Sequence, residues 1–162
     1  MPSNLPTKPT KPSKKDKAWS NLKDLPKELS NLRLDHIGIA VKDLDEASKP
    51  YLALGLEAVF PDEVIAEQFV KVRVFRLNGV GLELLQASGK ESPIAKFIEK
   101  RAEGLHHIAL QVADIEHEYK RLLNLGASFI GDEIRKGHNN SRIIFLHPKW
   151  ARGTLIELVE HE

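Results

Sequence analysis

The stretch Gly104-Leu-His-His-Ile-Ala-Leu-Gln-Val-Ala-Asp114 decides the fold, because the chain contains a second version of it. The earlier version is Arg33-Leu-Asp-His-Ile-Gly-Ile-Ala-Val-Lys-Asp43. One offset separates both His36 from His107 and Asp43 from Asp114, and a Leu-Gly pair follows each aspartate at the same distance. Such self-similarity indicates a duplicated structural unit. We therefore predict two related modules in tandem.

The repeat continues into a later segment that carries a glutamate. Val80–Leu85 is matched by Thr154–Val159, so Glu83 corresponds to Glu157. Side chains alternate along a strand, which places small residues beside each inner histidine and larger apolar residues on the opposite face. The small neighbours leave space in front of the histidines, as a binding site requires. The same alternation predicts that His106 points to the other face and has a structural role.

The hydrophobic pattern predicts one order of elements in both modules: a strand, a helix and three further strands. The first module is expected to have strands at 34–41, 56–60, 70–77 and 81–86, with a helix from Asp43 towards Gly55. The second is expected to have strands at 105–112, 127–130, 142–146 and 154–159, with a helix at 115–125. Pro50 should kink the first helix or confine it to its early turns.

The predicted fold class is α+β, with two tandem βαβββ modules whose mixed sheets face each other around a cleft. The expected domain organisation is a disordered basic arm with a short helical lead-in at 1–32, a first module at 33–90, a linker helix at 91–103 and a second module at 104–162. Residues 131–141 and 148–153 are rich in loop-forming residues and are predicted to be loops.

The composition is typical of a globular protein. Of the 162 residues, 41% are hydrophobic and 29% are charged, and the net charge is +1. Lysines gather in residues 1–17, so the remainder is mildly acidic and we expect no nucleic-acid partner. No apolar run suits a membrane helix, and without cysteine the chain has no disulfide or thiolate metal site. We expect a cytoplasmic homodimer with no membrane partner.

The paired histidines and glutamates form a candidate metal site. Two imidazoles and two carboxylates suit a divalent ion such as Co²⁺, Mn²⁺, Ni²⁺, Fe²⁺ or Zn²⁺, and they leave coordination positions for substrate oxygens. A lone histidine or glutamate on a strand is more often a core or edge residue, but recurrence in both modules favours a metal. The predicted ligands are His36, Glu83, His107 and Glu157. The histidines without such a counterpart are not assigned to the metal: His117, His138, His147 and His161.

Four segments resemble the vicinal-oxygen-chelate superfamily, which includes glyoxalase I, extradiol dioxygenases and bleomycin-resistance proteins. They are Asp35–Val41, Gly81–Leu85, Leu105–Ala109 and Leu155–Leu158. Three segments are similar to the methylmalonyl-CoA epimerase family in particular: Ser92–Lys100, Gly104–Ala109 and Ile144–Lys149. The likeness covers about residues 33–160, which is nearly all of the predicted folded part.

The resemblance implies a metal-dependent epimerase that removes and returns the α-proton of methylmalonyl-CoA through a metal-stabilised enolate. It places the metal on the same four residues and gives Glu157 a further role as a catalytic acid/base. Some epimerases carry a second glutamate at the position that holds Val72 here, so the second proton carrier stays open. Glu67, Gln68 and His138 are candidates, either directly or through a bound water.

Other activities within the superfamily are alternatives. Glyoxalase I, a lyase that acts on a hemithioacetal, can use a similar four-ligand site, but its last loop usually reads Asp-Pro-Asp-Gly where this chain has His147-Pro-Lys-Trp. An extradiol dioxygenase needs only three ligands, which would leave Glu83 without a role. A non-catalytic small-molecule-binding module needs no metal, and four candidate ligands argue against it.

An acyl-CoA substrate would need cations for its phosphates. The densest basic cluster outside the N-terminal arm is predicted in the loops of the second module, at Lys136, Arg142, Lys149 and Arg152.

Overall fold

The computed structural model describes residues 32–162, so the basic arm and most of the helical lead-in predicted for residues 1–32 lie outside the described residues. The first half contains β1 (Arg33–Val41), α2 (Leu44–Ala53), β2 (Ala58–Ile65), the short 3₁₀ turn η3 (Ala66–Gln68), β3 (Val70–Leu77) and β4 (Val80–Ala87). Helix α3 (Pro93–Arg101) leads to the second half, with β5 (Gly104–Gln111), α4 (Ile115–Asn124), β6 (Phe129–Lys136), η4 (His138–Asn140), β7 (Arg142–Leu146) and β8 (Ile156–Glu160). The α+β class is confirmed.

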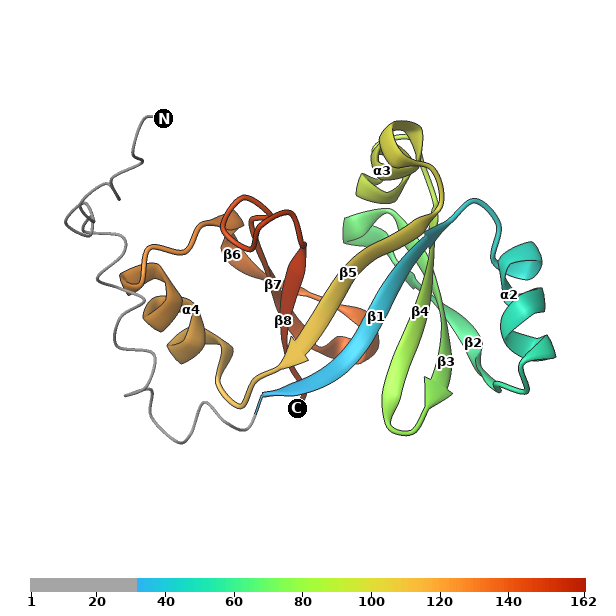
Figure 1. Cartoon of the computed structure of the whole chain (residues 1–162), viewed down its shortest axis with the longest axis horizontal. Helices are drawn as coiled ribbons and strands as arrows, with labels where there is room; N and C mark the ends of the chain where they lie inside the picture. Colours follow the sequence, from blue (N-terminus) through green and yellow to red (C-terminus); the bar gives the residue numbers. More distant parts are fainter. Residues whose placement is uncertain (1–31) are drawn as a thin grey trace, which may run out of the picture. The chain divides into compact units, whose positions relative to one another are not determined.

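All eight strands belong to one sheet, in the order β2-β3-β4-β1-β5-β8-β7-β6 (Figure 1). Two separate sheets were expected, but β1 and β5 pair antiparallel and join the halves. Each would otherwise be an open sheet edge, and pairing satisfies both rows of backbone donors and acceptors. From this seam outward the two halves have matching strand orders, and each begins with a parallel pair, β1 with β4 and β5 with β8.

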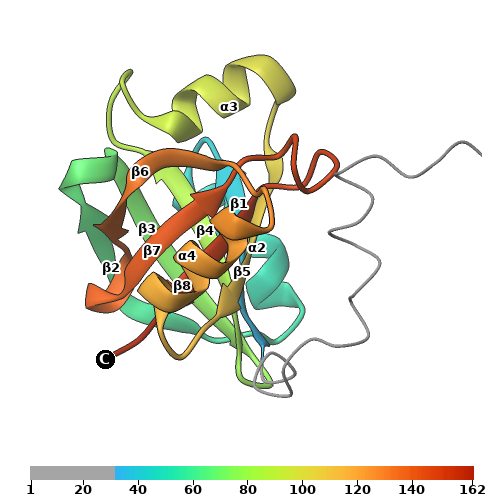
Figure 2. The same ribbon diagram turned by 90° about the vertical axis from the view of Figure 1, so that its left-hand side faces the viewer.

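The sheet curves so strongly that its two outer edges meet. The side-chain amide of Gln68, beside β2, donates a hydrogen bond to the carbonyl of Lys136 at the end of β6, with a nitrogen–oxygen distance of 2.8 Å. The backbone N–H of Asn139 in η4 donates to the carboxylate of Glu63 in β2 over 2.9 Å. Viewed along the long axis, the second half lies in front of the first (Figure 2). The cleft between the halves was therefore predicted correctly, although one curved sheet forms it.

The helices α2 and α4 lie on opposite sides of the molecule, outside the curve of the sheet (Figure 1). Both begin at the repeated aspartates: Asp43 accepts a hydrogen bond from the N–H of Glu46, and Asp114 accepts one from the N–H of His117. Helix α2 continues through Pro50 to Ala53, so the prediction that it could be confined to its early turns is wrong.

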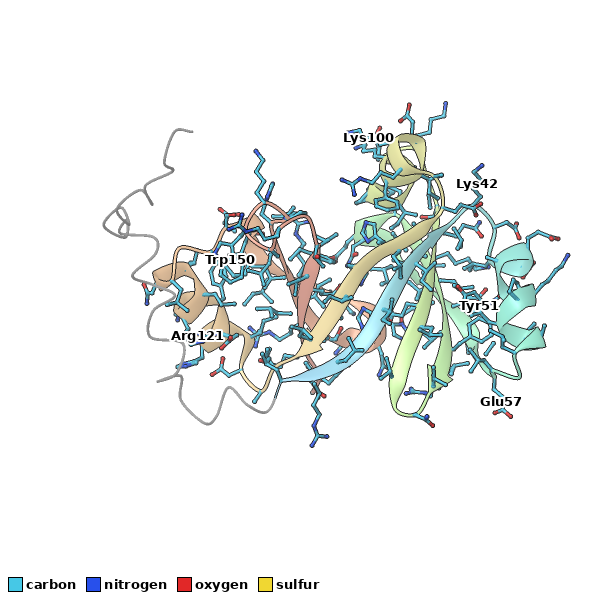
Figure 3. All side chains as sticks on the ribbon, viewed as in Figure 1. Lys42, Tyr51, Glu57, Lys100, Arg121 and Trp150 are labelled. Carbon is cyan, nitrogen blue, oxygen red and sulfur yellow. The ribbon has the colours of Figure 1, made fainter. Side chains whose placement is uncertain are left out.

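Packing explains why α2 continues past its proline. The ring of Tyr51 points from α2 towards the sheet (Figure 3) and lies 5.4 Å from the ring of Phe75, measured between centroids. A proline removes one intrahelical hydrogen bond, and the buried face and the N-terminal cap offset that loss. On α4, the apolar face packs on a second core cluster that includes Ile115, Leu122 and Leu158, and Trp150 covers its edge (Figure 3).

Strands β2 and β6 extend further than predicted. The β2–β3 register shifts between Val59 and Glu63, and the β6–β7 register shifts between Ile130 and Arg135. These irregularities accommodate Pro61 and Gly131, the second of which begins a segment that was predicted to be a loop. Both strands lie at sheet edges, where a residue without an N–H donor or with a bulged backbone costs little pairing.

Within residues 32–162, no helix combines the length and apolar character needed to cross a membrane.

Candidate active site

The four predicted ligands lie on the four central strands, on either side of the seam. His36 and His107 come from β1 and β5, and Glu83 and Glu157 come from β4 and β8. Each glutamate is in register with a small residue of the neighbouring strand, Glu83 with Gly38 and Glu157 with Ala109. All four ligand candidates are buried. The repeat in the sequence is therefore a repeat in space.

Three of these side chains converge on one point. The Nε2 atoms of His36 and His107 lie 3.0 Å apart, and Glu157 Oε2 lies 3.1 Å from the latter and 3.9 Å from the former. The three ligand atoms thus lie within 4.8 Å of one another. Glu83 lies at the edge of this group, with its Oε2 3.6 Å from the Nε2 of His36. It is a neighbour of the cluster more than a full member.

Two bulges on the seam aim the histidines. The β1–β5 register shifts between Leu34 and His36 and again between Gly38 and Ile39, which leaves Asp35 and His106 as the extra residues. A bulge breaks the alternation of side chains and redirects its neighbours. As a result His106 lies beside His107, with 2.9 Å between their Nδ1 atoms, and the prediction that it points to the opposite face is wrong.

Asp35 and His106 hold equivalent positions in the repeat and contact equivalent atoms. Asp35 Oδ1 lies 3.2 Å from the Nδ1 of His36, and its other oxygen lies 2.6 Å from the Nε2 of His161. A partner on Nδ1 fixes the orientation of each ring and leaves Nε2 for a ligand. The sequence analysis missed Asp35, although its place in the repeat, directly before the ligand histidine, was a usable signal.

Gly38 provides the space that His107 occupies. A Cβ atom at this position would lie 2.2 Å from Cε1 of His107 and 2.8 Å from its Nε2. Gly81, in register with His36, is less tightly confined, since a Cβ there would lie 3.1 Å from the Cβ of that histidine. The small residues noted in the sequence therefore make room for the imidazoles themselves.

The electrostatics of the cluster favour a positive charge at its centre. Burial lowers the pKa of His36, but the hydrogen bond with Asp35 and the charges of Glu83 and Glu157 outweigh it and raise that pKa to about 9. Burial raises the pKa of Glu83, against the opposing effect of His36. A divalent ion supplies such a charge, and bonds of about 2.1 Å at right angles place neighbouring donor atoms about 3.0 Å apart. The donor set and its spacing therefore fit a divalent metal.

A cavity of about 370 Å³ lies in front of the cluster. Its walls come from both halves of the chain and include apolar side chains such as Val72, Ile94 and Phe145. The three residues proposed from the sequence as proton carriers, Glu67, Gln68 and His138, all line it. A second cavity of about 430 Å³ adjoins the first, because His106, His107 and Leu155 line both.

The basic cluster predicted for CoA phosphates does not form. Lys136 is in register with Arg142 at one end of β7, whereas Lys149 and Arg152 follow the other end of that strand. Arg142 also forms ion pairs with Glu116 and Glu160, at 2.6 and 3.0 Å. A five-residue strand separates the two pairs by roughly 14 Å. Closeness in the sequence gave no information on which end of the strand each residue occupies.

Comparison with known proteins identifies the family. Residues 35–145 match the Glyoxalase/Bleomycin resistance protein/Dioxygenase superfamily. The chain belongs to this superfamily. The match includes His36, Glu83 and His107 and ends before Glu157.

Methylmalonyl-CoA epimerases are prominent among the relatives in this superfamily. An ethylmalonyl-CoA/methylmalonyl-CoA epimerase of Cereibacter sphaeroides is 40% identical over 129 residues, which is 78% of this chain and 96% of that protein. The crystal structure of methylmalonyl-CoA epimerase from Mycobacterium tuberculosis is 38% identical, with a TM-score of 0.75, and the match covers 80% of this chain and 87% of that one. A Streptomyces coelicolor methylmalonyl-CoA epimerase in complex with 2-nitronate-propionyl-CoA is 41% identical, with a TM-score of 0.75 and coverage of 79% and 96%.

Proposed function

We propose that this chain is a metal-dependent methylmalonyl-CoA epimerase, which removes the α-proton of its substrate and returns it to the opposite face. The observation that carries the proposal is the cluster of His36, His107 and Glu157, whose ligand atoms lie within 4.8 Å of one another at a cavity. The cluster stands in a fold whose relatives include methylmalonyl-CoA epimerases of 35–41% identity.

The residues that would hold the ion are His36, His107 and Glu157, with Glu83 beside them as a fourth ligand. When bound, a divalent ion polarises the oxygens of the acyl group and so acidifies the C–H bond between them. The donor set suits Co²⁺, Mn²⁺, Ni²⁺, Fe²⁺ or Zn²⁺. Asp35 and His106 hold the two imidazole rings through their Nδ1 atoms.

Glu157 acts as an acid/base in addition to holding the ion. A carboxylate has two oxygens, so one can stay at the cluster while the other exchanges a proton with the α-carbon. The apolar walls formed by Val72, Ile94 and Phe145 keep bulk water from the reacting carbon. The expected homodimer and cytoplasmic location stay predictions.

The second cavity is the proposed route for the pantetheine arm of an acyl-CoA. It lies between α3 and the segment 148–155, and it joins the first cavity at His107. Arg101 lines it, and the exposed Lys149 and Arg152 follow or precede its lining residues Pro148 and Gly153. Arg101 and these two members of the predicted cluster stand where a chain leaving the site would emerge.

Reversing charge at this opening tests the route. In the double variant Arg101→Glu/Lys149→Glu, the KM for methylmalonyl-CoA should rise about tenfold or more at low salt, with kcat nearly unchanged, because the phosphates lose cationic partners far from the reacting carbon. Steady-state kinetics measure both constants. The matched control is Lys120→Glu/Lys136→Glu, with the same charge change elsewhere. If the control raises KM and the test variant does not, the assigned route is wrong.

A substrate panel with metal analysis tests the function itself. The purified chain should contain about one divalent ion per protein by elemental analysis, and it should interconvert the methylmalonyl-CoA epimers and lose this activity with chelator. It should be inactive on the hemithioacetal of glutathione. Activity on the hemithioacetal alone would favour the glyoxalase alternative, and a chain without metal or turnover would favour the binding module.

A further inference from the structure

The second proton carrier of the reaction can be assigned from the cavity lining. The assignment rests on the proposed function, because inversion of a carbon needs an acid/base on each face and Glu157 serves one. At the position where some epimerases carry a second glutamate, this chain has Val72, which is buried and cannot carry a proton. The missing group must therefore lie elsewhere on the wall.

Five side chains of the cavity lining ionise and stand outside the four-residue cluster: Glu67, Glu91, His106, Arg135 and His138. Arginine stays protonated and cannot accept a proton. Glu67 and Glu91 are exposed, and the latter lies 3.7 Å from the ammonium of Lys96. His106 is occupied by its contact with the Nδ1 of His107. His138 is the remaining group among the described residues.

His138 is held in place by a carboxylate from the other half of the chain. Its Nδ1 forms an ion pair with Oε2 of Glu63, whose same oxygen accepts a hydrogen bond from the N–H of Asn139. The imidazole is partly buried, with 31% of its side chain exposed. The Nδ1 atom is buried and forms no aligned hydrogen bond in this pair, so the charge of the carboxylate orients the ring and leaves Nε2 as the atom that exchanges protons. This pairing spans the contact between the two outer sheet edges.

His138 and Glu157 approach the main cavity from different elements, η4 and β8. A small side cavity of about 100 Å³ is lined by His36, Glu83 and His138, all of which also line the main cavity. His138 therefore belongs to the wall near Glu83. Glu157 comes from β8, where it contacts His107 on the other side of the seam. A substrate in the main cavity would have one of these groups towards each side.

We propose that His138, positioned by Glu63, is the second catalytic acid/base of the epimerase. In one direction the Nε2 lone pair of His138 takes the α-proton, the C–H bond electrons remain on the substrate as an enolate, and protonated Glu157 delivers a proton to the opposite face. The reverse direction exchanges the two roles. Each turnover leaves His138 protonated and Glu157 deprotonated, so both groups exchange protons with water before the next one.

The test follows solvent deuterium from each pure epimer in D₂O. In the wild type, early product should carry deuterium while recovered substrate does not, because separate groups remove and deliver the proton. In His138→Ala and His138→Gln, epimerisation should fall by about 10²–10⁴-fold. Glu157 should still exchange the α-proton of one epimer with retention, whereas exchange from the other epimer is lost. Added imidazole should partly restore the alanine variant.

Controls separate this role from a structural one. Metal content and thermal midpoint should match the wild type in both His138 variants and in His117→Ala, which removes an exposed histidine outside the cavity. Glu63→Gln should lower kcat with little change in KM, since it removes only the orienting carboxylate. The proposal is overturned if both His138 variants epimerise within about threefold of wild type. A wild-type chain without epimerase activity would instead overturn the proposed function.

Discussion

Glu157→Gln is expected to lower epimerisation of methylmalonyl-CoA by about 10⁴-fold, the largest effect of any single conservative substitution in the site. The side chain contacts His107 and His36 in the cluster. In the proposed mechanism it also exchanges a proton with the α-carbon, so it has two roles. Glutamine has nearly the same shape, but its amide cannot take a proton and is a weaker ligand for a divalent ion. Replacing one carboxylate oxygen with an amide nitrogen therefore removes both functions.

The matched control is Glu83→Gln, at the equivalent position of the first half. Glu83 contacts His36 in the cluster, at 3.6 Å, and it is assigned no proton transfer. Its replacement should lower the affinity for the metal by about 10–100-fold. Activity should persist when the ion is in excess. Turnover and metal content are measured in parallel at several ion concentrations. Equal defects in the two variants, both restored by excess ion, would show that Glu157 is a ligand only.

Gly38→Ala should remove the metal site without unfolding the chain. The new Cβ would stand 2.2–2.8 Å from ring atoms of His107, so the imidazole must leave its position beside His36. We expect the bound ion to be lost and epimerisation to fall by about 10³-fold or more, with a loss of stability of about 1–3 kcal/mol from overpacking. A one-carbon change on a strand would thus act as strongly as removing a ligand.

Elemental analysis, turnover and chemical denaturation measure these effects. Gly89→Ala is the control, because a Cβ there would meet only Phe69, at an ordinary distance of 3.8 Å. It should keep its metal and activity. A Gly38→Ala variant with normal metal content would mean that the ring has another place to go, and it would contradict the assigned role of this glycine.

The core of the site could be predicted because duplication and strand periodicity act together. His36 and His107 repeat at one offset, and alternation placed each beside a small residue on the correct face. His106 could not be placed, because the bulge that redirects it is a property of the β1–β5 pairing and leaves no mark in local propensity. Asp35 occupies the other bulge, and its place directly before His36 in the repeat was a signal that the sequence analysis did not use.

Contacts between distant strands also lay beyond the sequence. Glu63 reaches His138 only because the sheet curves until its edges meet. The basic loops failed similarly, since Lys136 and Lys149 lie at opposite ends of one strand although they are close in sequence. Pairing within a strand ladder is periodic and predictable, whereas curvature is a collective property of the whole sheet.

The seam between β1 and β5 has a consequence for how the protein folds. Residues paired across it, such as Gly38 and His107, are further apart in the chain than residues paired within either half, such as His36 and Gly81. Contacts of long sequence separation form late, so the halves should fold first and dock last. The proposed ion would bind where they dock, and at one hundred times its Kd it would add about 2.7 kcal/mol to the stability of the docked state alone. Removal of the metal should therefore increase the rate at which the two halves separate, and this separation should precede the unfolding of either half.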